Sequence, residues 1–222
     1  AEMSKLGLPV PPGFIISTEV CKLFYKNKKR LPKQVLKSIQ LELKTIEKLT
    51  SRKFGDLKNP LLVSVRSGAR VSMPGMMDSI LNLGLNDQTV KALAKKTGNG
   101  RFAKESYRRF IQMYSNVVLN IEGHLFEGMI DSQKLNKGVL LDTELEENDW
   151  DELIQRFKEL VKKQTKKKFP QSVQEQLYGA ISAVFLSWDS QRAKTYRKLN
   201  QIPDHWGTAV NVQSMVFGNM GN

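Results

Sequence analysis

The stretch LLVSVRSGARVSMPGMMDSILNLGL, residues 61–85, is the part of the sequence that decides the fold. Its apolar start is typical of a short buried strand, and we expect a strand over residues 61–66 that ends at Arg66. Ile80, Leu81 and Leu83 predict a second strand, after a loop that contains glycine, proline and methionine. Small residues follow Arg66, so a ligand can approach its side chain and the backbone together.

Arg66 is the first candidate for a ligand-binding residue. Its guanidinium is a planar, permanently charged fork that matches phosphate, and Ser67, Gly68 and Ala69 leave their N–H groups accessible. Ligand contacts often cluster where strands end in α/β folds. Two ordinary alternatives stay open, which are an arginine paired with a buried carboxylate and an arginine at the edge of a strand.

The loop after Arg66 contains Met73, Met76 and Met77, and then Asp78. Methionine is adaptable and polarizable, so these side chains suit a flat apolar surface such as a purine ring. Filling the core under a loop explains them at least as well. Asp78 is suited to binding a metal or an amine, or to capping a turn, and the cap is the simpler interpretation.

Hydrophobic spacing and capping residues predict the elements before this stretch. Residues 15–16 suit a short strand, and Ser17 or Thr18 then begins a brief helix that runs to Tyr25. A longer helix is predicted from Pro32 to about Lys53, because its apolar residues keep helical spacing.

The pattern after Asn86–Asp87 is helical to about residue 200. Gly123 closes the first apolar stripe of this block. Thr143 and Glu146 form a capping box before the second stripe. The three apolar stripes at helical spacing cover residues 107–121, 150–161 and 173–188.

Strand character returns at residues 209–217, where the apolar period becomes two. The backbone of residues 211–216 could read adenine, which needs one donor and one acceptor, if it lies at a sheet edge. An ordinary buried strand fits the spacing equally well. We therefore predict an α/β (α+β) fold that is predominantly helical. It divides into an α/β part over residues 1–86, a helical insertion over residues 87–200, and the start of a second strand region over residues 201–222.

Composition limits the classes of function. The chain has 222 residues, of which 40% are hydrophobic, so it can bury a sizeable core. One cysteine, Cys21, excludes an internal disulfide and a metal site of several thiolates. His124 and His205 have no second ligand at metal spacing. No stretch approaches the roughly 18 apolar residues of a membrane helix, and no signal peptide is recognisable, so we expect the cytoplasm.

The formal net charge of +13 does not by itself indicate nucleic acid. The lysine clusters, such as residues 26–30 and 162–168, lie mostly at or beyond helix ends, where the helix dipole favours cations. No aromatic residues interleave them to stack on bases. Arg192, Arg197 and Lys198 are expected on a solvated or interdomain face. We therefore expect no nucleic-acid partner and no membrane partner.

Four segments together resemble the pyruvate, phosphate dikinase family. They are LGLPVPPGF (6–14), SVRSGARVSMPGMMDSILNLGLND (64–87), SWDSQRAKTYR (187–197) and IPDHWGTAVNVQSMVFGNMG (202–221). The resemblance runs over the whole chain. The related phosphoenolpyruvate synthases share the proline-rich entry and the arginine strand, but this chain keeps GARVSMPGMMD after the arginine, so the dikinases match better.

The resemblance implies a piece of an amino-terminal ATP-binding domain with an ATP-grasp-like fold. Enzymes of this family interconvert ATP, phosphate and pyruvate with AMP, pyrophosphate and phosphoenolpyruvate, and they use Mg²⁺. The implied partners are these substrates, a swivelling phosphohistidine domain of the same chain, and a second subunit in a homodimer.

The resemblance also assigns residues to the nucleotide. Arg66 matches an arginine that contacts the nucleotide phosphates, and Gln213, Met215 and Val216 match the hinge beside adenine. The loop supplies further candidates, which are Met73, Met77 and Asp78.

Departures from the family pattern limit what we expect of this chain alone. A phosphate-contacting lysine of the family lies just before its first residue, and an SGTGV-like segment with ligands for Mg²⁺ and phosphate follows its last. We therefore expect no catalytic residue, no metal ligand, no bound cofactor and no dikinase activity in this piece. Three alternatives stay open: a phosphoenolpyruvate synthase-like ATP-binding domain, a basic helical module that binds nucleic acid, and a naturally truncated regulatory protein.

Overall fold

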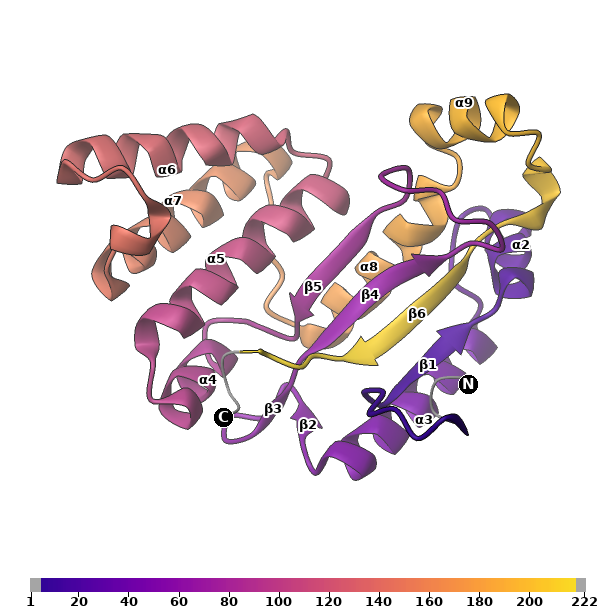
Figure 1. Ribbon diagram of the computed structural model, residues 1–222, viewed down its shortest axis with the longest axis horizontal. Coiled ribbons are helices and arrows are strands. Elements are labelled where there is room, and N and C mark those ends of the chain that lie inside the picture. The colour runs from indigo at the N-terminus through magenta and orange to yellow at the C-terminus, as the bar shows by residue number, and fades with distance from the viewer. Residues whose placement is uncertain (1–4, 219–222) are drawn as a thin grey trace.

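A four-stranded antiparallel sheet forms the centre of the computed structural model, which describes residues 5–218 (Figure 1). In spatial order its strands are β1 (Gly13–Ile16), β6 (Ala209–Ser214), β4 (Val63–Gly68) and β5 (Ser79–Leu83). A two-stranded parallel sheet pairs β2 (Lys53–Phe54) with β3 (Pro60–Leu61). Residues 1–4 and 219–222 lie outside the described range, so the GNMG turn of the predicted last region (218–221) is described only at Gly218.

Eight α-helices within residues 5–218 surround the sheet. They are α2 (Thr18–Lys26), α3 (Lys33–Thr50), α4 (Thr89–Thr97), α5 (Gly100–Val117), α6 (Gly123–Lys137), α7 (Glu147–Thr165), α8 (Val173–Ser187) and α9 (Gln191–Leu199), with 3-10 turns η1 (Asp142–Glu144) and η2 (Asp204–Trp206). In Figure 1, α8 lies behind the sheet and α5, α6 and α7 form a group beside β5. The expectation of a predominantly helical α+β fold is therefore confirmed.

Strand register gives the sheet one apolar face and one open face. Val65 of β4 lies opposite Val212 of β6 and Ile80 of β5, and all three side chains are buried. This face packs on α8, because successive side chains of a strand point to opposite sides. Arg66 and Asn211, the next pair along, therefore point to the side that α8 does not cover.

The helical group shares its core with the sheet. Phe169 packs edge to face against Tyr107, Phe110 and Tyr114, with ring centroids 6.5, 5.8 and 5.6 Å away. These rings belong to the same buried apolar cluster as the strands β4, β5 and β6. The division of the chain at residues 86 and 200 stays a prediction.

A second, smaller core joins the loop between β4 and β5 to the segment around α9, residues 188–206, which we call the α9 region. We call this core the satellite cluster, and its buried members are Met73, Trp188, Ala193 and Ile202. Arg197 lies beside it and corrects an expectation, because its side chain is only 1% exposed rather than on a solvated face. Its guanidinium stacks 4.2 Å from the Trp188 ring, and its Nε donates to Asp204 at 2.7 Å. The aromatic ring and the carboxylate stabilise a charge that would otherwise be costly to bury.

Several predicted ends differ from the structure. Gly123 begins α6 instead of closing the preceding helix, because α5 stops at Val117 and Asn120 takes a left-handed φ of 55°. The Ile121 N–H then bonds the Ser115 carbonyl at 3.0 Å, which makes the turn between the two helices. The strand predicted over residues 209–217 ends at Ser214.

The predicted capping box of Thr143 and Glu146 is wrong. Thr143 lies within η1, and α7 has Glu146 as its N-cap. Asp149 completes the box three residues later, since its carboxylate accepts the Glu146 N–H at 3.0 Å. Asp149 is buried, and it also accepts hydrogen bonds from Lys137 at 3.0 Å and Gln133 at 3.2 Å. The capping box therefore lies three residues later than predicted, at Glu146 and Asp149, and its second residue is buried.

Within residues 5–218, no helix is both long and apolar enough to cross a bilayer.

We expect Asp149→Ala to destabilise the fold by about 1–3 kcal/mol, because it removes a helix cap and leaves buried donors unpaired. Burial alone would raise the pKa of Asp149, but the Glu146 N–H, Lys137 and Gln133 together hold it below its ordinary 3.8. The Asp149 carboxylate thus stabilises the fold above about pH 4, and this contribution is lost as the pH falls through its lowered pKa.

Urea unfolding of the wild type and Asp149→Ala at several pH values measures this difference. Asp151→Ala on the same helix is the control, since Asp151 is 46% exposed and pairs with Lys104. A surface pair contributes about 0–1 kcal/mol. Equal stabilities of the two variants at neutral pH would contradict the prediction.

Candidate functional site

Arg66 stands on the open face of the sheet. It is exposed, and its cross-strand neighbours are Asn211 of β6 and Ser79 of β5. Within residues 5–218 it forms no ion pair with a carboxylate. The arginines that do so are Arg101, Arg108, Arg109, Arg192 and Arg197. An ion pair of Arg66 with a buried carboxylate is thus not seen in this range. Arg66 does not lie at a sheet edge either, because β4 is an inner strand.

The small residues after Arg66 extend the strand further than expected. β4 continues to Gly68, where Ser67 and Gly68 lie opposite Val210 and Ala209 of β6. Ala69 then leaves the sheet and packs against the satellite cluster. The ten residues between Gly68 and Ser79 form the connection that we call the β4–β5 loop, residues 69–78.

The methionines of the β4–β5 loop pack against protein. Met73 is buried in the satellite cluster, which is the core-filling role, and Met77 is half-buried beside it. The Sδ atom of Met77 lies 3.9 Å from the Ser187 hydroxyl. The structure therefore brings these residues to the end of α8, on the same side as α9.

Asp78 closes the loop and forms an ion pair with Arg192 of α9. The Arg192 Nε also donates to the Met76 carbonyl at 3.2 Å. Neither partner could be inferred from the sequence, because 114 residues separate Asp78 from Arg192. Arg70, which no sequence motif marked either, places its guanidinium 5.6 Å from the Trp206 ring.

The predicted hinge residues lie at the end of an inner strand and not at a sheet edge, since Gln213 is within β6 and Met215 and Val216 follow it. The Gln213 side-chain amide donates to the Pro11 carbonyl at 3.0 Å. The N–H groups of Ser214 and Met215 donate to the carbonyls of Pro12 and Leu62, each at 2.8 Å. These donors are therefore occupied, whereas Val216 lies beyond the strand and its side chain is 70% exposed.

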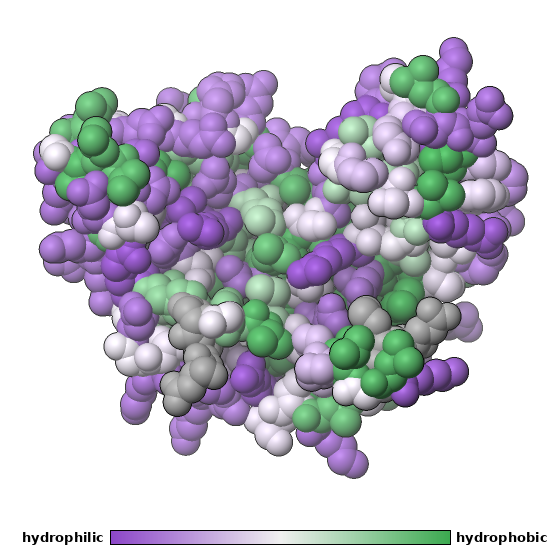
Figure 2. Space-filling model, in the orientation of Figure 1, coloured by the Kyte–Doolittle hydropathy of each residue, from purple (hydrophilic) through white to green (hydrophobic). Residues whose placement is uncertain are grey.

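Figure 2 views the open face, where hydrophilic and apolar surface lie side by side between the helical group and the α9 region. The two groups of site residues, Arg66 with the β4–β5 loop and Gln213 to Val216, come from strands that are direct neighbours. The sheet thus joins segments that lie far apart in the sequence.

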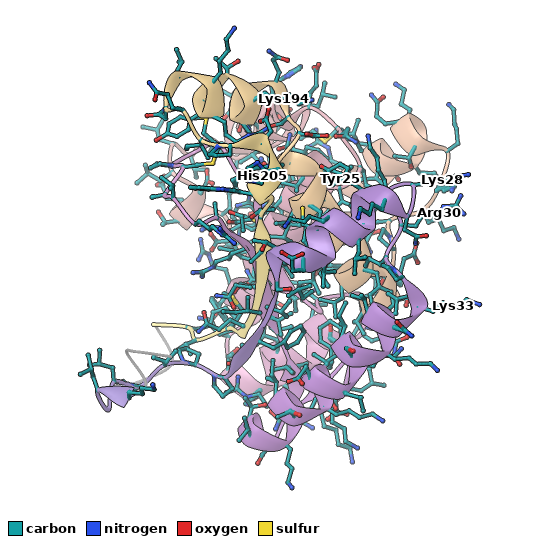
Figure 3. All side chains as sticks on the ribbon, turned by 90° about the vertical axis from the view of Figure 1, so that its right-hand side faces the viewer. Tyr25, Lys28, Arg30, Lys33, Lys194 and His205 are labelled. Atoms are coloured by element: carbon teal, nitrogen blue, oxygen red, sulfur yellow. The ribbon has the colours of Figure 1, made fainter. Side chains whose placement is uncertain are left out.

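No group of three or more His, Cys, Asp or Glu side chains converges within residues 5–218. His124 is exposed and lies 3.4 Å from Glu122. His205 lies exposed on η2 and is labelled in Figure 3. Lys28 and Arg30, in the connection between α2 and α3, and Lys33, the first residue of α3, point outward in the same view.

The chain is similar to known proteins over its whole length. Residues 27–221 match the family described as pyruvate phosphate dikinase, AMP/ATP-binding domain. The chain is 54% identical over 222 residues to pyruvate, phosphate dikinase of Clostridium symbiosum and 51% identical to that of Rhizobium meliloti, with all of this chain and 25% of each relative covered. The chloroplastic pyruvate, phosphate dikinase of Flaveria trinervia is 51% identical, with 23% of its length covered.

The chain therefore spans about a quarter of the length of the curated relatives it matches. The match to the family's AMP/ATP-binding domain covers nearly all of the chain and includes both segments of the open face, Arg66 with its loop and the residues that follow β6. By this match and by identity over its full length, the chain belongs to the pyruvate, phosphate dikinase family.

Proposed function

We propose that this chain forms one wall of the ATP site of a pyruvate, phosphate dikinase. That enzyme interconverts ATP, phosphate and pyruvate with AMP, pyrophosphate and phosphoenolpyruvate. The observation that carries the proposal is Arg66, an exposed guanidinium that has no carboxylate partner within residues 5–218 and lies on the open face of the sheet. The identity of 54% over the whole chain to a relative of that name supports it.

Arg66 would neutralise charge on the nucleotide phosphates. Phosphoryl transfer depends mainly on positioning and on stabilising the charge of the transferred group. The sheet holds the backbone of Arg66 on an inner strand, and the planar fork of its guanidinium can contact two phosphate oxygens at once. Asn211 and Ser79, its neighbours on the same face, would add uncharged polar contacts.

Adenine would lie at the end of β6, beside Gln213, Met215 and Val216. The backbone of Val216 is the part we assign to the base, because the N–H groups of Ser214 and Met215 already have partners. Met77 and Asp78 would border the phosphate side through the β4–β5 loop. Met73 supports that loop from inside the satellite cluster.

The remaining features of the proposal concern the whole enzyme. We propose an ATP-grasp-like fold in three parts divided at residues 86 and 200, a cytoplasmic location, a homodimer, and a swivelling phosphohistidine domain as partner. We propose no nucleic-acid partner. Mg²⁺ would accompany ATP, but the acidic residues described here do not form a site for it, so we assign it no ligand in this range.

We expect the 222-residue chain alone to lack dikinase activity and to bind Mg-ATP weakly or not at all. The described residues offer one wall of the site without a converging metal site, and both binding and transfer need the metal to offset phosphate charge. Isothermal calorimetry with Mg-ATP measures this directly. Micromolar affinity of the isolated chain would contradict the prediction.

We expect Arg66→Gln to lower kcat/KM for ATP by roughly tenfold to a hundredfold, because it removes a charged hydrogen-bonding contact to the nucleotide. The assay uses a hybrid enzyme, in which this chain replaces the matching 222 residues of the Clostridium symbiosum relative. Arg66→Lys should recover part of the loss, because it restores the charge but not the planar fork.

Arg109→Gln in the hybrid enzyme is the matched control. Arg109 is also an exposed arginine, 61% exposed, and it pairs with Glu105 of the same helix, α5. It should leave kcat/KM for ATP within about twofold of the parent, as expected for a surface ion pair. If Arg66→Gln behaved like this control, Arg66 would not contact the nucleotide.

A further inference from the structure

The β4–β5 loop is attached to the α9 region at three separate points. Near its start, the Arg70 guanidinium lies 5.6 Å from the ring of Trp206. In its middle, Met73 is buried in the satellite cluster. At its end, Asp78 pairs with Arg192 of α9. Figure 1 shows this loop running between the sheet and α9.

The attachment ends directly beside Arg66. Arg66 lies opposite Ser79 in the sheet, and Ser79 follows Asp78 in the chain. The loop itself begins after Gly68, two residues beyond Arg66. A displacement of Asp78 therefore acts on both the strand partner of Arg66 and the loop that borders it.

Arg192 makes the polar part of this attachment. Its guanidinium pairs with the Asp78 carboxylate, and its Nε donates to the Met76 carbonyl at 3.2 Å. The Asp78 N–H donates to the hydroxyl of Ser187, the last residue of α8, at 3.5 Å. Arg192 is half-exposed at 51%, whereas Asp78 is 24% exposed, so the pair sits at a surface where its loss should not unfold the core.

We propose that Arg192 is a positioning residue that fixes the β4–β5 loop against α9 and so sets the affinity of the site at Arg66 for ATP. The inference rests on the proposed function of that site. It makes the α9 region a control element for nucleotide binding, because a shift of α9 moves Arg192, the satellite cluster and Trp206 together. The loop then follows, since all three of its attachments lie on that region.

The test uses Arg192→Gln in the hybrid enzyme. We expect KM for ATP to rise about threefold or more, with KM for pyruvate and kcat changed by less than about twofold, as for a half-exposed ion pair that acts on one substrate. Amide hydrogen exchange over residues 70–78 should become about tenfold faster, because the loop opens more often when one attachment is lost.

Two further variants distinguish a positioning role of Arg192 from a general effect of losing its charge. Arg192→Lys keeps the charge but cannot contact Asp78 and the Met76 carbonyl as a fork, so an intermediate KM is expected. The charge swap Arg192→Asp with Asp78→Arg should recover most of the exchange protection of the loop. Lys194→Gln is the control on the same helix, since Lys194 is 50% exposed, lies 3.8 Å from Asp189 and forms no hydrogen bond or ion pair with the loop within residues 5–218.

Each outcome decides between the proposals. If Arg66→Gln weakens ATP use and Arg192→Gln behaves like Lys194→Gln in KM and exchange, the inference about Arg192 fails and the ATP site stands. If Arg192→Gln raises the KM values for ATP and pyruvate alike, its role is structural and the inference fails. If Arg66→Gln has no effect either, the proposed site itself is wrong.

Discussion

The pairing of β4 with β6 is the interaction on which the rest of the structure depends. It joins residues such as Ser64 and Gln213, which are 149 positions apart, in the middle of the sheet. Its register places Val65 opposite Val212 on the buried face and Arg66 opposite Asn211 on the open face. A shift by one residue would exchange these faces, which would bury the guanidinium and expose the valines.

This pairing also fixes what surrounds the open face. The helices α4 to α9 must fit between the end of β5 and the start of β6, and α8 returns beneath the sheet to cover its apolar side. The chain then turns at α9 and η2 before it enters β6. That path brings Trp188, Arg192 and Trp206 to the β4–β5 loop, so the same constraint that closes the sheet also creates the satellite cluster.

Much of the fold was predictable because local signals agreed with tertiary packing. The strands around Val63 and Ile80 and the helical block between residues 87 and 200 follow from the period of their apolar residues. Element ends were less predictable. Gly123 and Thr143 are ordinary helix-end residues, but the turn at Asn120 and the buried carboxylate of Asp149 depend on contacts with other elements.

By itself, the sequence determined the α+β class, the place of Arg66 on an apolar strand, and the family resemblance. The reason is that hydrophobic period and short motifs are local properties of the chain. Only the tertiary structure decided that β6 is an inner strand, that Arg197 is buried, and that Asp78 pairs with Arg192. Such pairs depend on strand order and on the path of a long helical connection, and no spacing between neighbouring residues encodes either of them.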